Sequence, residues 1–71
     1  MSNPYEATAE DFAKWQGYAK KLSVSELRFA INDCQRAAEA MATHPAPNKE
    51  NYYRDQAATL NQELRRRLSH N

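Results

Sequence analysis

The stretch LSVSELRFAINDCQRAAEAM, residues 22–41, decides the fold of this 71-residue chain. Its apolar side chains recur every three or four residues, which places them on one face of a helix: they are Leu27, Ile31, Cys34, Ala38 and Met41. Ser23 and Glu26 have the spacing of a capping box, and Leu22 and Leu27 have that of a hydrophobic staple. We therefore expect a helix over about residues 24–42 whose start is fixed by Ser23.

A second apolar stripe follows a proline-containing loop. It consists of Tyr53, Ala57, Leu60, Leu64 and Leu68. The two stripes match when they are read in antiparallel order, and Leu27 then meets Leu68 at the end away from the loop. The sequence therefore predicts an all-α fold built on an antiparallel helical hairpin of about residues 24–42 and 49–68.

A shorter helix is expected over about residues 8–21. Thr8 and Asp11 resemble another capping box, and an apolar face follows, made of Phe12, Trp15, Ala19 and Leu22. We expect this helix to pack across the hairpin, on a second face of residues 24–42 that carries Phe29, Ala30, Ala37 and Ala40. Residues 1–7 are expected to form a loose N-terminal arm, so residues 1–71 make a single helical domain.

Composition excludes several functional classes. The net charge is +1, so no global attraction to nucleic acid or membrane is expected. No apolar run approaches the ~20 residues that span a bilayer, and the cytoplasm is the expected compartment. One cysteine, with His44 and His70 far apart in the sequence, offers no metal site. No catalytic or cofactor-binding motif is present, and a chain this small has little room for a pocket, so we expect a protein that is not an enzyme.

Basic side chains are expected to gather where the first helix ends, the second begins and the third ends. They are Lys20, Lys21, Arg28, Arg65, Arg66 and Arg67. One interpretation is a binding site for an anion or an acidic protein surface. The other is compensation of the helix dipoles, with Glu26 and Glu63 as local ion-pair partners.

Aromatic side chains are numerous for so small a core, and most are expected to pack inside it. Tyr5, Tyr18 and Tyr52 are the candidates for exposed contacts, because aromatic and basic side chains together are typical of protein interfaces. Phe29 lies off the main stripe, so it should serve the first helix or a partner chain.

Residues from Leu22 onward resemble small accessory proteins of tailed bacteriophages. The resemblance rests on Leu22, Ser23, Glu26, Leu27, Phe29–Ile31, Asp33, Cys34, Ala37–Ala40, Tyr52, Tyr53, Asp55 and Glu63–Arg67. Some phage proteins of this size inhibit host enzymes or defence complexes, so the resemblance implies a host protein as partner. The matching positions are mainly helix caps and core, so the resemblance assigns no functional residue.

These observations favour a non-enzymatic protein-binding module that acts by covering a surface of a host protein. Binding of nucleic acid or a nucleotide through the same basic side chains is an alternative. In a helix-turn-helix interpretation, residues 24–42 would be the recognition helix, but Glu26 and the apolar residues that follow suit burial better. A third possibility is a homodimeric assembly component, because a chain this short has a thin margin of stability and self-association adds to it.

Overall fold

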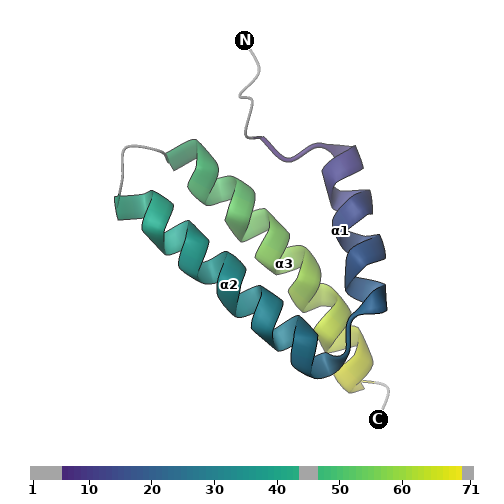
Figure 1. Cartoon of the computed structure of the whole chain (residues 1–71). Helices are drawn as coiled ribbons and strands as arrows, with labels where there is room; N and C mark the ends of the chain where they lie inside the picture. Colours follow the sequence, from purple (N-terminus) through teal and green to yellow (C-terminus); the bar gives the residue numbers. More distant parts are fainter. Residues whose placement is uncertain (1–5, 44–46, 70–71) are drawn as a thin grey trace.

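The protein consists of three helices, seen in a computed structural model that describes residues 6–43 and 47–69, with only the backbone of residues 47 and 48. The helices are α1 (Ala9–Lys21), α2 (Val24–Thr43) and α3 (Pro47–Ser69). α2 and α3 form a long antiparallel hairpin (Figure 1). α1 lies across this hairpin and ends near the point where α2 begins and α3 ends. The expected all-α fold is thus confirmed, and the described residues contain no strand.

Both predicted capping boxes are formed. The hydroxyl of Thr8 accepts a hydrogen bond from the Asp11 amide at 3.1 Å, and the Asp11 carboxylate accepts one from the Thr8 amide at 3.0 Å. Ser23 and Glu26 make the same reciprocal pair at 3.1 and 2.8 Å. Each box satisfies two of the backbone groups that a helix end leaves without partners, so α1 and α2 start at the expected residues.

The start of α3 differs from expectation by two residues. The helix begins at Pro47 rather than Lys49. Proline is tolerated in the first turn because its fixed φ suits a helix and an amide hydrogen there has no helical partner.

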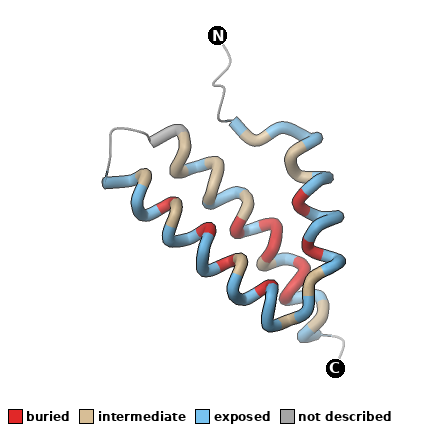
Figure 2. Tube along the Cα trace, in the orientation of Figure 1, coloured by how far each residue is buried: buried red, intermediate tan, exposed pale blue. Residues whose placement is uncertain are grey.

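The core lies between α2 and α3, with one contribution from α1. It contains Ala19, Leu27, Ile31, Cys34, Ala57, Leu60 and Leu64. Leu27 and Leu60 are fully buried, and each such burial contributes about 2 kcal/mol. Figure 2 shows the buried positions along the facing sides of the two hairpin helices and on the inner side of α1. The antiparallel pairing of the two apolar stripes is therefore confirmed over most of its length.

Leu68 is an exception, because it does not belong to the buried part of the stripe. Its exposed fraction is 46%. The last positions of the stripe are Leu60, Leu64 and Leu68, four residues apart, and each step of four turns the side chain about 40° further round the helix. Leu60 and Leu64 remain within the face that meets α2, and Leu68 has turned out of it.

α1 packs chiefly against α3, which corrects its expected place on α2. The Trp15 ring meets the edge of the Tyr52 ring with centroids 5.1 Å apart, and Trp15 is only 6% exposed. Thr59 and Glu63, which share this face of α3, are buried as well. α3 therefore has two buried faces and is the central helix, whereas the face of α2 around Phe29 has no helix on it.

Candidate functional site at the basic end

Three helix ends meet at one end of the molecule, as Figure 1 shows. We call residues 20–28 and 63–69 the basic end. It carries six basic and two acidic side chains, against four basic and seven acidic ones in the rest of the chain. A molecule of net charge +1 thus has a strongly uneven charge distribution.

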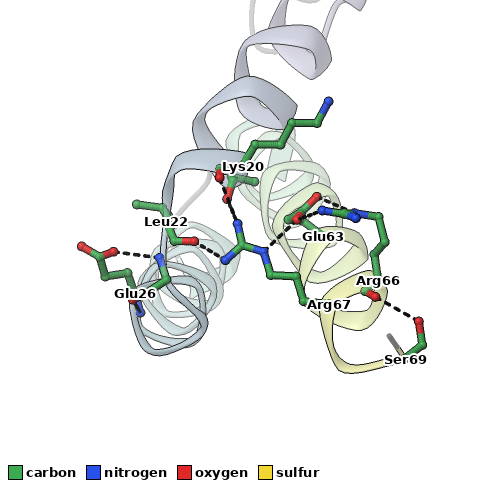
Figure 3. A network of polar contacts seen from close by, with 9 residues as sticks. Lys20, Leu22, Glu26, Glu63, Arg66, Arg67 and Ser69 are labelled. Atoms are coloured by element: carbon green, nitrogen blue, oxygen red, sulfur yellow. Dashed lines mark hydrogen bonds and ion pairs between the residues drawn. The ribbon is translucent and has the colours of Figure 1, made fainter. Parts of the chain in front are cut away.

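Arg67 holds the end of α1. Its Nη2 donates to the carbonyl oxygens of Ala19 at 2.9 Å and Lys20 at 3.1 Å, and its Nη1 donates to that of Leu22. These carbonyls lie at the C-terminus of α1, where a positive charge is favourable, and the Ala19 carbonyl also accepts the Leu22 amide at 3.2 Å. Figure 3 shows the guanidinium of Arg67 between α1 and α3. Its role is therefore to join two helices, a role that the sequence did not predict.

Glu63 orients that guanidinium. Its carboxylate accepts a hydrogen bond from Arg67 Nε at 2.8 Å and binds Arg66 through Nε at 3.1 Å and Nη2 at 2.6 Å. Hydrogen bonds from Arg66 and then Arg67 lower the pKa of Glu63 from 4.5 to about 2, so the carboxylate is ionised at neutral pH. The expected ion-pair role of Glu63 is present in the structure. Glu26 instead accepts the Ser23 amide in its capping box, which lowers the pKa of Glu26.

Four cations of the basic end are exposed and have no internal partner. In the part of the chain that the structure describes, their side chains make no hydrogen bond or ion pair. They are Lys20, Lys21, Arg28 and Arg65. The side chain of Lys20 extends away from the Arg67 network in Figure 3, although its carbonyl belongs to that network. Arg66 is also accessible, with 57% of its side chain exposed.

Dipole compensation explains only part of this arrangement. Lys20 and Lys21 lie in the last turn of α1, and Arg66 and Arg67 lie in that of α3, where cations are favoured. Arg28, in contrast, lies one turn from the N-terminus of α2, an end that favours anions.

A polar groove of about 230 Å³ runs between α1 and α3 at this end. It is lined by Gln16, Lys20, Thr59, Gln62, Glu63 and Arg66. The two amides and two cations offer donors to an incoming acidic group, but the Glu63 carboxylate lines the same groove. The groove therefore offers hydrogen-bond donors beside a carboxylate, a combination that disfavours a small anion.

A second, more apolar groove of about 420 Å³ opens on the other side of α1, against α2. Tyr18 and Phe29 line it and are 50% and 69% exposed. Tyr18 is thus accessible, as the sequence suggested. The sequence left open whether Phe29 packs against the first helix or contacts a partner chain. In the structure none of the described helices covers it.

Tyr52 was expected to be an exposed contact, but the structure partly buries it. Its ring is half-buried between Trp15 and Tyr53, with centroids 5.1 and 5.9 Å away. Burial, helped by the nearby Asp11 carboxylate, raises the pKa of the Tyr52 phenol. Tyr52 therefore anchors α1, and Tyr5 lies outside the described residues.

The described residues hold no group of three or more His, Cys, Asp or Glu side chains placed to bind a metal ion. His44 and His70 lie outside that part of the chain. Cys34 is a buried thiol whose pKa is raised by burial and by Asp33. None of the described helices has the length and apolarity that crossing a membrane requires.

No protein-family model, curated protein or solved structure matches the chain.

Proposed function

We propose that this chain is a protein-binding module that docks its basic end on an acidic surface of a partner protein and acts by covering that surface. The observation that carries the proposal is the set of unpaired cations at the meeting point of the three helices: Lys20, Lys21, Arg28 and Arg65. Like charges that gather without counter-charges repel one another, so a partner that brings acidic groups relieves this repulsion on binding.

The arrangement of other groups supports a protein as the partner. Tyr18 is half exposed on α1, beside the apolar groove, and lies three residues from Lys21 on the same helix. An aromatic side chain next to cations is typical of protein interfaces. The resemblance to small phage accessory proteins adds the proposal that the partner belongs to the host of a phage and is inhibited or modulated by this contact.

The test reverses charge where the structure leaves the cations unpaired. The Lys21→Glu/Arg65→Glu protein is compared with a Lys14→Glu/Arg54→Glu control, which changes the net charge equally but outside the basic end. Arg67 is left intact because its loss would release α1. Each protein is immobilised and exposed to nuclease-treated host lysate. The captured species should be lost with the first variant and kept with the control; equal capture by both would contradict the proposal.

Nucleic acid is the second candidate, because the same four cations could contact phosphates. Four phosphate contacts on double-stranded DNA predict a slope of about −3.6 for log K against log salt concentration, so affinity would fall about 150-fold between 50 and 200 mM salt. A protein surface has no comparable layer of condensed counterions, so the slope should be shallower. Titration of a DNA oligonucleotide and of the purified captured species distinguishes the two candidates.

A further inference from the structure

The outer face of α2 is a regular exposed stripe, which we call the seam, and none of the other described helices packs on it. Its residues repeat at alternating spacings of three and four, as the contact positions of a coiled coil do: they are Glu26, Phe29, Asp33, Arg36, Ala40 and Thr43. All six are exposed, and this face lies on the opposite side of α2 from the core residues Leu27, Ile31 and Cys34. The core stripe is thus one of two regular stripes on the same helix.

This seam is complementary to itself when a second α2 runs antiparallel to the first. In the register that overlaps nearly the whole helix, Phe29 lies opposite Ala40 of the other copy. The same register brings Asp33 opposite Arg36. A two-fold axis repeats both pairs, so a large side chain meets a small one twice and opposite charges meet twice.

The pairing groups are available. Within the described residues, Asp33 and Arg36 form no ion pair with each other or with other side chains. Ala40 is small and lies opposite Phe29 of the other copy, so it leaves room for that ring, whose 69% exposure is the largest of any large apolar side chain that the structure describes. A parallel arrangement would place Asp33 against Asp33 and Arg36 against Arg36, so like charges disfavour it.

We propose that a second copy of this chain docks on the outer face of α2 through the residues Phe29, Asp33, Arg36 and Ala40, as an antiparallel two-fold dimer. The seam contains none of the cations of the basic end, and it meets the proposed partner contact only at the groove that Phe29 and Asp33 share with Tyr18. One large apolar side chain per copy makes a small interface, so we expect a dissociation constant on the order of 10–100 µM.

Sedimentation equilibrium of the full chain between 1 µM and 1 mM tests the proposal. The wild-type protein should shift from monomer to dimer over this range. Phe29→Ala should weaken the dimer by about tenfold or more, with unchanged helicity because Phe29 is exposed. Leu68→Ala, which removes another exposed apolar side chain, on α3 and away from the seam, should leave the dimer intact.

Charge exchange tests the register. Asp33→Arg and Arg36→Asp should each weaken self-association by about tenfold or more, because each places like charges opposite one another. Mixing the two variants should restore a dimer, since both ion pairs form in the mixed species. A wild-type protein that stays monomeric at 1 mM would overturn the proposal, as would a dimer insensitive to Phe29→Ala or a mixture that does not associate. These measurements use the isolated chain, so the dimer and the capture of a partner by the basic end can each fail independently of the other.

Discussion

Replacing Arg67 by alanine should release α1 from the hairpin. Three of its hydrogen bonds end on the carbonyl oxygens of Ala19, Lys20 and Leu22. A hydrogen bond contributes about 1 kcal/mol net, and one from a charged donor contributes more. Water can reach these carbonyls once the side chain is gone, because 22% of the side chain is already exposed. We therefore expect Arg67→Ala to lower the free energy of unfolding by about 2–3 kcal/mol.

This loss is large for the chain. At about 0.05–0.15 kcal/mol per residue, a protein of 71 residues has a free energy of unfolding of about 4–10 kcal/mol. The expected loss corresponds to a fall in Tm of about 10–20 °C. Alanine has a slightly higher helix propensity than arginine, so the substitution itself does not weaken α3.

The assay follows two signals during urea and thermal unfolding. Trp15 is the single tryptophan and lies buried on α1, so its fluorescence reports the docking of that helix. Circular dichroism at 222 nm reports all three helices. In Arg67→Ala the Trp15 emission should shift to the red while most of the helical signal is still present.

Arg65→Ala is the matched control. It removes the same side chain two residues away on α3, where the guanidinium is exposed and unpaired within the described chain. Its effect should stay within about 0.5 kcal/mol. If the two variants unfold at the same urea concentration and with the same Trp15 emission, Arg67 does not hold α1, and the reasoning is refuted.

Three further measurements test other parts of the structure. The pKa of Glu63 is about 2, below its ordinary value of 4.5, so the stabilisation from its ionised form is complete above pH 4.5 and is lost as the pH falls through 2. The urea midpoint of Glu63→Gln should therefore differ from the wild-type midpoint near neutrality, and the difference should shrink toward pH 2; a constant difference would contradict this. Ser23→Ala should lower the free energy of unfolding by about 1 kcal/mol because it removes the N-cap of α2. Ser25→Ala, which leaves the cap in place, is the control, and an equal loss in both variants would contradict a role of the cap. The buried Cys34 thiol, with its raised pKa, should react with an aromatic disulfide reagent slowly in buffer and rapidly in urea, and equal rates would place it at the surface.

The helix starts and the hairpin could be predicted because their causes are local or periodic. Each capping box joins residues only three apart, so the pattern is visible in the sequence. The antiparallel match of the two stripes follows from the spacing of their apolar residues. The same spacing overextended the stripe to Leu68, since two steps of four residues had rotated it off the face.

The position of α1 could not be predicted from hydrophobicity. The face of α3 that receives it combines Tyr52 with Gln56, Thr59 and Glu63, and three of these four are polar. Their spacing of four, three and four residues was visible in the sequence, but an apolar helix was expected on the alanine-rich face of α2. What fixes α1 is the edge contact between Trp15 and Tyr52 and the Arg67 bonds to carbonyls.

The sequence predicted where the basic side chains gather, but it did not predict that they make different contacts there. Antiparallel packing brings Lys20, Arg28 and Arg65 to one end whatever the side chains do. The inward orientation of Arg67 depends on a carbonyl 45 residues earlier in the chain, and no local pattern contains that information. A run of three arginines is therefore divided by the fold: Arg65 faces solvent, Arg66 pairs with Glu63, and Arg67 joins α1 to α3.

This division bears on how both proposed contacts are tested. Reversing all three arginines would remove a surface cation and undock α1 together, so a loss of binding could not be assigned to either cause. Lys21 and Arg65 can be changed without touching the Arg67 network, and Asp33 and Arg36 can be changed without touching the basic end. If the Lys21/Arg65 reversal abolishes partner capture while self-association persists, the two surfaces act separately. If Phe29→Ala abolishes both the dimer and partner capture, the partner binds only the dimer, and the antiparallel register then sets how far apart the two basic ends are presented.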